Sequence, residues 1–172
     1  YTTDANGRGP AWANSLFEDN AEFGLGFRLT VDQHRQRVMR LLAQFADKLP
    51  PELNDALHAE ATPEVRREQV AELRKVLANE EGAKELLTDA DALVEKSIWL
   101  IGGDGWAYDI GFGGLDHVLS LTENVNILVL DTQCYSNTGG QASKATPLGA
   151  VTKFGEHGKR KARKDPVSYT HL

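Results

Sequence analysis

Residues 98–105 read Ile-Trp-Leu-Ile-Gly-Gly-Asp-Gly, and residues 127–131 read Ile-Leu-Val-Leu-Asp. Each begins with a continuous apolar run rich in β-branched or aromatic side chains, which predicts two strands that are buried on both faces. Between the runs, apolar residues recur at helical spacing over residues 112–119. A helix in this connection makes the two strands parallel neighbours, so the sequence predicts a βαβ unit.

Oxygen-bearing residues follow both predicted strands. The carboxyl ends of parallel strands meet at the edge where ligands bind, so Asp104 and Thr132 are predicted to lie side by side. The glycines on either side of Asp104 leave room for a diphosphate close to the backbone. Magnesium takes oxygen ligands such as the Asp104 carboxylate, the Thr132 hydroxyl and the Cys134 carbonyl. Free amides at the start of the crossover helix favour phosphate charge, so this edge is a predicted magnesium and diphosphate site.

The two segments resemble a known family. Residues 103–119 read GDGWAYDIGFGGLDHVL, and residues 125–144 read VNILVLDTQCYSNTGGQASK. Thiamine diphosphate enzymes carry Gly-Asp-Gly and, a couple of dozen residues later, an Asn that shares the magnesium ion with the Asp. Thr132 stands in place of that Asn, which argues against the decarboxylase and synthase branches. Together the segments closely resemble pyruvate:ferredoxin (flavodoxin) oxidoreductase, and the resemblance extends upstream through residues 8–24 and downstream to about Asp165.

The resemblance implies an α/β fold, a parallel-sheet thiamine diphosphate-binding domain of the diphosphate type, preceded by a helical segment. Residues 1–165 are expected to form part of the C-terminal thiamine diphosphate-binding domain, with a helical part at about 14–96 and a βαβ cofactor part at about 97–150. Residues 166–172 leave the family pattern abruptly, and the last six resemble a translated transposon-end adaptor. They are expected to be a non-native tail.

The resemblance also assigns the site. Asp104, the Thr132 side chain and the Cys134 carbonyl are the implied magnesium ligands, so a redox role for the Cys134 thiol is not expected. Asn137 is expected nearest the thiazolium, as the catalytic residue whose amide hydrogen-bonds the substrate-derived oxygen. The expected cofactor-binding residues are Gly103, Asp104, Gly105, Trp106, Thr132, Gln133, Cys134, Tyr135, Ser136 and Asn137.

The implied reaction is oxidative decarboxylation of pyruvate with coenzyme A to acetyl-CoA and CO2. The implied cofactors are thiamine diphosphate and Mg2+, with electrons passing through 4Fe-4S clusters to ferredoxin or flavodoxin. The chain has one cysteine, whereas a four-iron cluster normally needs four thiolates, so the cluster ligands are expected elsewhere and the chain is expected to be an inactive fragment. The full-length enzyme is expected to be a cytoplasmic homodimer that binds neither nucleic acid nor membrane.

Composition sets broad limits. A chain of 172 residues is long enough for one hydrophobic core. A net charge of -6 favours solubility and does not indicate a function. One cysteine excludes an intramolecular disulfide framework, and no apolar stretch is long enough to span a bilayer.

The residues before and between the predicted strands are assigned to helices. One amphipathic helix is expected over residues 27–49, ended by Pro50 and Pro51. A second is expected from the Thr62 cap to about Leu77, followed by another to about Glu95. In the crossover, Asp109 and Asp116 are expected on the helix surface or as caps, and His117 as a structural histidine packed on the sheet.

The same residues admit other interpretations. Gly-Asp-Gly alone is a common turn, and it becomes a site only when paired with the second strand end. A related 2-oxoacid oxidoreductase with another substrate remains an alternative. A nucleic-acid-binding module could use the basic residues between Lys153 and Lys164, but Phe154 is the only aromatic residue among them and the rest of the chain is acidic. Dinucleotide binding is disfavoured because the third glycine of GxGxxG is missing.

Overall fold

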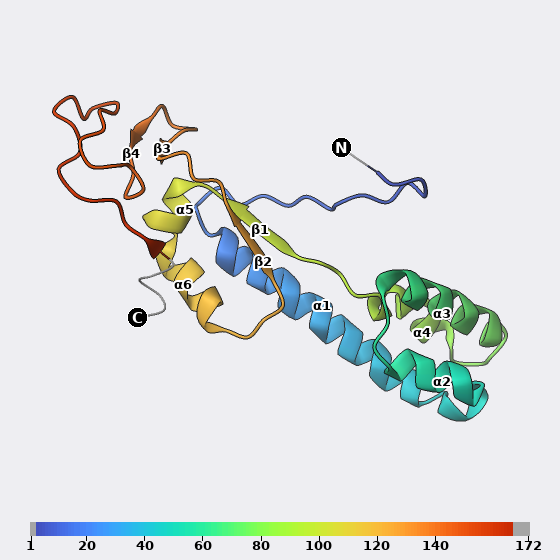
Figure 1. The fold of residues 1–172 in the computed structure, drawn as a ribbon. Helices are drawn as coiled ribbons and strands as arrows, with labels where there is room; N and C mark the ends of the chain where they lie inside the picture. The colour runs from blue at the N-terminus through green and yellow to red at the C-terminus, as the bar shows by residue number, and fades with distance from the viewer. Residues whose placement is uncertain (1–2, 167–172) are drawn as a thin grey trace. The chain divides into compact units, whose positions relative to one another are not determined.

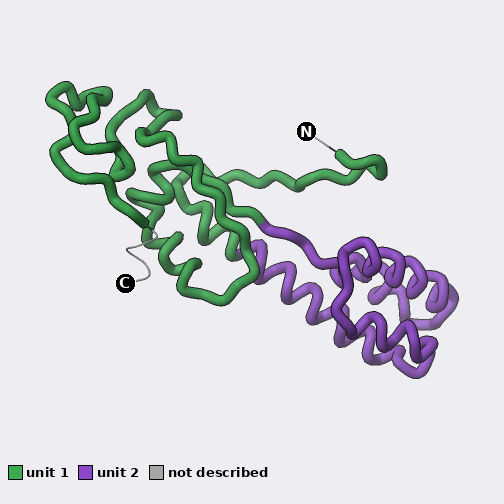
Figure 2. The backbone as a smooth tube through the Cα atoms, viewed as in Figure 1, with its two compact units in different colours: residues 1–25, 99–172 green, residues 26–98 purple. Residues whose placement is uncertain are grey.

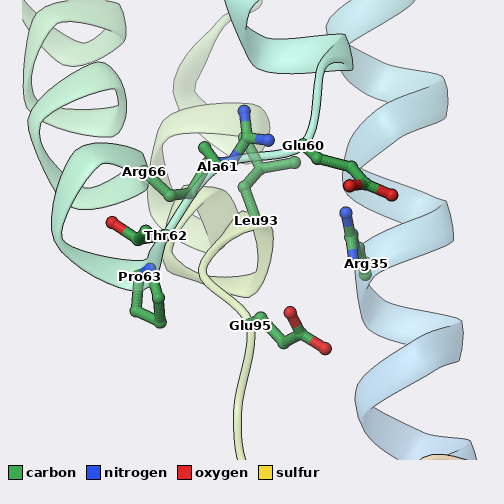
Figure 3. A pocket seen from close by; sticks show the side chains of 8 residues that line it. All are labelled: Arg35, Glu60, Ala61, Thr62, Pro63, Arg66, Leu93 and Glu95. Carbon is green, nitrogen blue, oxygen red and sulfur yellow. The ribbon is translucent and has the colours of Figure 1, made fainter.

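The computed structural model describes residues 3–166, which divide into two compact units (Figures 1 and 2). Unit 1 contains residues up to 25 and from 99 onward, and unit 2 contains residues 26–98. Within the described part of the chain, none of the helices combines the length and the apolar character needed to cross a membrane. The expected non-native tail falls, apart from Pro166, outside the described residues.

The elements follow one another as six α-helices, two 3-10 helices and four strands within residues 3–166 (Figure 1). The α-helices are α1 (Asn20–Ala43), α2 (Pro51–His58), α3 (Pro63–Val76), α4 (Lys84–Asp89), α5 (Asp104–Tyr108) and α6 (Phe112–Ser120). The 3-10 helices are η1 (Ala46–Lys48) and η2 (Ala90–Leu93). The strands are β1 (Trp99–Gly102), β2 (Asn126–Val129), β3 (Cys134–Tyr135) and β4 (Gln141–Ala142).

The predicted βαβ unit is confirmed. β1 and β2 are parallel neighbours, with Trp99 opposite Asn126 and Gly102 opposite Val129. The connection contains two helices, α5 and α6, rather than one. Asp104 is the first residue of α5, so the predicted site residue stands where β1 turns into helix.

The predicted burial of both sheet faces is wrong. Leu100 is buried, but Trp99 is 58% exposed and Leu128 is 41% exposed. The sheet has two strands within residues 3–166, so elements of unit 1 cover only part of its surface. A continuous apolar run cannot by itself distinguish a strand covered on both faces from one covered on one face.

The first helix begins earlier and ends earlier than predicted. α1 starts at Asn20 rather than at residue 27, and it stops at Ala43, after which the chain forms η1. Its early start depends on Gly24, because a Cβ atom there would lie 2.4 Å from Cγ of Leu100. Asn20 also ties the helix to β1, since its Nδ2 donates to the Ile101 carbonyl at 3.1 Å. The start of α1 at Asn20 is thus stabilised by contacts with β1, which the local sequence pattern does not reveal.

The predicted Thr62 cap is confirmed. The Thr62 hydroxyl accepts a hydrogen bond from the Val65 amide at 3.4 Å, and Pro63 is the first residue of α3. Pro51, which was expected to end a helix, instead opens α2 as its first residue. Proline fits the first helical turn because its missing N–H has no intrahelical partner there.

Unit 2 packs its helices around one apolar core. The core side chains come from α1, α2, α3, α4 and η2 and from the loops between them. They are Val38, Leu42, Leu49, Leu53, Leu57, Val70, Leu73, Leu77, Ala83, Leu86, Ala90, Leu93 and Val94.

A buried arginine links α2 and α3 within this unit. Arg66 is 4% exposed, and its guanidinium donates to the carbonyls of Ala56 at 3.0 Å and Leu57 at 2.8 Å and also to that of Ala59. The last carbonyls of a helix have no intrahelical partners, so Arg66 supplies the partners that the end of α2 lacks.

Replacement of Arg66 by Met is expected to destabilise unit 2 by about 2–3 kcal/mol, because the buried carbonyls at the end of α2 lose their donors. Arg67→Gln is the matched control, since Arg67 makes only an exposed ion pair with Glu64 at 3.3 Å, which contributes less than about 0.5 kcal/mol. Urea unfolding followed by helical circular dichroism measures both. Equal stability of the two variants would show that water satisfies the α2 carbonyls.

Candidate functional site

Asp104 is a buried carboxylate at the carboxyl end of β1. It is 3% exposed, and its Oδ1 accepts from the Thr132 amide at 3.1 Å while its Oδ2 accepts from the Ser143 hydroxyl at 2.8 Å. Among residues 3–166, no Lys or Arg forms an ion pair with Asp104. A buried charge is costly unless it is paired or coordinates a metal, so this carboxylate suits a cation that the chain does not itself supply.

The other two predicted metal ligands lie together in the segment after β2. The Thr132 hydroxyl donates to the Cys134 carbonyl at 2.9 Å. Neighbouring ligands of an octahedral magnesium ion, each at about 2.0–2.1 Å from the metal, are themselves about 2.9 Å apart. Since the Thr132 amide also contacts Asp104, the structure brings all three predicted oxygen donors to one edge. One carboxylate, one hydroxyl and one carbonyl are a donor set that fits magnesium shared with a diphosphate.

A tight turn presents the Cys134 carbonyl. Gln133, between the two predicted ligands, has a φ of 63°, in the left-handed region. Its amide donates to Oδ1 of Asp131 at 3.2 Å. The second oxygen of Asp131 accepts from the Tyr108 hydroxyl at 2.8 Å and forms an ion pair with Arg163. The turn is therefore held by side chains from α5 and from the C-terminal segment.

The glycines beside Asp104 play different parts. A Cβ atom at Gly103 would lie 3.9 Å from the Leu130 carbonyl oxygen, an ordinary van der Waals distance, so a side chain there would meet no clash. A Cβ atom at Gly105 would lie 2.6 Å from Oε1 of Glu18 and 2.8 Å from the Tyr135 ring. The close neighbours of Gly105 are thus parts of this chain.

Trp106 is fully buried in unit 1. Its ring lies against Gly102, where a Cβ atom would be 2.3 Å away, and its indole N–H has no hydrogen-bond partner among the described residues. The ring of Trp106 therefore fills the core of unit 1.

The segment expected to be a loop after Cys134 contains an antiparallel hairpin. β3 and β4 pair with Tyr135 opposite Gln141, and the residues between them form the turn. Ser136 and Asn137 are exposed on this turn, and the Asn137 side chain makes no hydrogen bond within residues 3–166. The structure does not bring Asn137 into contact with Asp104 or Thr132, so its catalytic role stays a prediction.

Asp109 was expected on a helix surface or as a cap, and the structure places it at a helix end, as the C-cap residue of α5. Asp109 stands between α5 and α6, where it accepts from the Lys144 amide at 3.2 Å and pairs with the Lys144 ammonium at 3.6 Å. It also hydrogen-bonds Tyr135. Asp116 is exposed on α6, as predicted, whereas His117 is exposed rather than packed on the sheet.

Burial raises the pKa of Tyr135, and its hydrogen bond with Asp109 raises it further. The folded state therefore resists loss of the phenolic proton, so this contribution to stability is complete below the ordinary tyrosine pKa of about 10 and declines as the pH rises above it. We expect the urea midpoint of unit 1 to fall less between pH 9 and pH 11 in Tyr135→Phe than in the unaltered chain. Parallel curves would show that Tyr135 ionises equally in both states.

Part of the basic C-terminal stretch makes contacts within unit 1, whereas Arg160 and Lys161 are exposed. Lys159 donates to the carbonyls of Lys144 at 3.0 Å and of Thr146. Arg163 pairs with Asp131, and the Lys164 ammonium lies 3.0 Å from the centre of the Phe112 ring. These bonds favour a structural role for the stretch over a continuous basic surface for nucleic acid.

Two buried residues near Asp104 were missed by the sequence analysis. Ser143 binds the Asp104 carboxylate, and Thr146 donates to the Gln133 carbonyl. A Ser-x-x-Thr turn can be recognised in the sequence. The contacts of Ser143 with Asp104, 39 residues earlier, and of Thr146 with Gln133, 13 residues earlier, depend on the tertiary fold.

Comparison with known families identifies this arrangement. Residues 81–171 match the family described as "Thiamine pyrophosphate enzyme, C-terminal TPP binding domain". The chain belongs to this family. Its parallel β1–β2 pair and preceding helices confirm the predicted fold class for a TPP-binding domain, and Asp104 occupies the Gly-Asp-Gly position within the matched region.

Full-length relatives of this TPP-binding domain are oxidoreductases by name. The chain is 88% identical over 165 residues to "Probable pyruvate-flavodoxin oxidoreductase" of Escherichia coli, which covers 96% of this chain and 14% of that protein. It is 46% identical over 179 residues to "Pyruvate:ferredoxin oxidoreductase" of Moorella thermoacetica, covering 96% of this chain and 15% of that protein. It is also 46% identical over 175 residues to "Pyruvate dehydrogenase [NADP(+)], mitochondrial" of Euglena gracilis, covering 96% of this chain and 10% of that protein. The chain thus spans about one seventh or less of each relative's length.

Proposed function

We propose that this chain holds the magnesium ion and the diphosphate of thiamine diphosphate in a pyruvate:flavodoxin or pyruvate:ferredoxin oxidoreductase. In the proposed full-length enzyme, a cytoplasmic homodimer, pyruvate and coenzyme A give acetyl-CoA and CO2, and 4Fe-4S clusters pass the electrons on. The observation that carries the proposal is that Asp104 accepts from the Thr132 amide while the Thr132 hydroxyl donates to the Cys134 carbonyl, so the three residues lie together at one edge of the sheet.

Each site residue has a distinct part in this proposal. Asp104 supplies the negative charge that a divalent ion requires, while the Thr132 hydroxyl and the Cys134 carbonyl add neutral oxygens. For both oxygens to serve as ligands, the hydroxyl hydrogen of Thr132, which the structure directs to the Cys134 carbonyl, would have to point elsewhere. Thiamine diphosphate held by these residues would supply the carbon nucleophile for a 2-oxoacid substrate. Asn137, exposed on the β3–β4 turn, is the proposed donor to the substrate-derived oxygen.

The proposed metal and diphosphate site does not determine which electron acceptor the enzyme uses. Relatives named for flavodoxin, ferredoxin and NADP+ all share this region with the chain. Pyruvate is the substrate in all three names, which favours pyruvate over another 2-oxoacid. The shared region is therefore proposed to provide the common cofactor chemistry, and the acceptor is chosen by other parts of each enzyme.

Binding of Mn2+, a spectroscopic substitute for Mg2+, tests the proposal directly. Free Mn2+ is measured by electron paramagnetic resonance while the chain is titrated, with thiamine diphosphate or with unphosphorylated thiamine. We expect thiamine diphosphate, but not thiamine, to increase Mn2+ uptake beyond what the free cofactor binds. We also expect no pyruvate-dependent reduction of viologen by the chain alone. Equal Mn2+ uptake with either compound would contradict the proposed site.

A further inference from the structure

A turn with two buried hydroxyl groups lies beside the proposed metal ligands. Ser143 is 4% exposed and Thr146 is 1% exposed. The turn closes on itself, because the Thr146 amide donates to the Ser143 carbonyl at 3.2 Å and the Ser143 amide donates to the Thr146 hydroxyl at 2.9 Å. Buried hydroxyl groups are nearly always hydrogen-bonded. The groups that accept from Ser143 and Thr146 are therefore the groups that the turn positions.

The Ser143 hydroxyl points its hydrogen at Asp104. Its oxygen accepts from the Ala145 amide at 3.1 Å, and it donates to Oδ2 of Asp104 at 2.8 Å. Oδ1 of Asp104 accepts from the Thr132 amide. A carboxylate has about four lone-pair positions, so these two bonds fix the plane of the group and leave one position on each oxygen for a metal.

The Thr146 hydroxyl acts on the other side of the site. Because its oxygen already accepts from the Ser143 amide, its hydrogen is directed to the Gln133 carbonyl. That carbonyl belongs to the peptide that joins Gln133 to Cys134. Cys134 itself is a β3 residue opposite Ala142, so the hairpin restricts its own dihedral angles. Anchoring the planar peptide before it therefore restricts the direction of the Cys134 carbonyl, which is the proposed third ligand.

We propose that Ser143 and Thr146 are positioning residues that set the Asp104 carboxylate and the Cys134 carbonyl in place before metal binds. This inference rests on the proposed function, because it concerns the metal site assigned there. One turn, closed by its own hydrogen bonds, contacts both strand ends, so the two hydroxyls work as a unit. Partners of metal ligands of this kind change metal affinity about 10–100-fold when removed.

Affinity for Mn2+ in the presence of saturating thiamine diphosphate tests the two hydroxyls in the 172-residue chain. Thr146→Val keeps the side-chain shape and removes the hydroxyl, whereas Thr146→Ser keeps the hydroxyl. Ser143→Ala removes the donor to Asp104. Thr138→Val is the matched control, because Thr138 is exposed and, among the described residues, its hydroxyl bonds only Gln141. We expect Thr146→Val and Ser143→Ala each to weaken Mn2+ binding at least about 10-fold, with Thr146→Ser and Thr138→Val close to the unaltered chain.

Folding is measured on the same samples by tryptophan fluorescence, and affinities are compared for the folded fraction. If Thr146→Val does not fold, Ser143→Ala and Thr146→Ser carry the test. Reduced stability with unchanged Mn2+ affinity in Ser143→Ala would mean a structural role and would overturn the inference, leaving the proposed function intact. Failure of the unaltered chain to take up Mn2+ with thiamine diphosphate would remove both.

Discussion

Asp104→Asn is expected to weaken Mn2+ binding in the presence of thiamine diphosphate by at least about 100-fold, since altering even the partners of a metal ligand costs 10–100-fold. Asp104 supplies the one carboxylate among the three proposed ligands, and the neutral amide of Asn is a much poorer ligand for a divalent ion. Electron paramagnetic resonance of free Mn2+ measures the change. In the proposed full-length oxidoreductase, the same substitution is expected to abolish pyruvate-dependent electron transfer at ordinary magnesium concentrations.

The free energy of unfolding should respond differently from metal affinity. Asp104 is 3% exposed and lacks a cationic partner within residues 3–166, so Asn removes the cost of a buried charge and keeps an acceptor for the Thr132 amide. This gain offsets the loss of the bond that the Ser143 hydroxyl donates to the second oxygen. We expect the stability of metal-free unit 1 to stay within about 1 kcal/mol of the unaltered chain or to increase. Asp116→Asn, an exposed change on α6, is the control for both measurements. Metal affinity retained in Asp104→Asn would exclude Asp104 as a ligand.

The sequence predicted the part of the site that local pattern determines. Two apolar runs with a helical connection require parallel strands, and parallel strands bring the residues after them, Asp104 and Thr132, to one edge. No other structural information is needed for that step, because chain connectivity and handedness leave few alternatives.

The remainder of the site depends on contacts between residues distant in sequence. The Ser143–Thr146 turn reaches Asp104 only because the β3–β4 hairpin reverses the chain, and hairpins with two-residue strands leave little trace in hydrophobic periodicity. The early start of α1 was hidden for a related reason, since Gly24 weakens helix propensity locally but admits Leu100 in the folded unit. The predicted burial of both sheet faces was too high because an apolar run does not indicate how many helices and strands pack against the strand that it forms.

Gly111→Ala is expected to destabilise unit 1 by about 3 kcal/mol, at the upper end of the usual cost of overpacking. The backbone of Gly111 has a φ of -84°, which any residue adopts, so the cost is steric. A Cβ atom there would lie 2.3 Å from the Glu18 carbonyl oxygen and 2.7 Å from both Cα and the carbonyl oxygen of Trp106. These are backbone atoms that cannot rotate away, and α5 carries Asp104 in the same turn as Trp106. Displacing α5 should therefore weaken Mn2+ binding as well.

Gly113→Ala, two residues later, is the matched control with the opposite expected sign. A Cβ atom at Gly113 meets nothing within 4 Å, and the residue lies inside α6, where alanine is favoured over glycine by about 1 kcal/mol. All three tryptophans, Trp12, Trp99 and Trp106, belong to unit 1, so urea unfolding followed by tryptophan fluorescence reports this unit without interference from unit 2. If Gly111→Ala proved as stable as Gly113→Ala, then α5 and the backbone at Glu18 would have to move apart at little cost in free energy. The position of Asp104 could not then depend on their close approach.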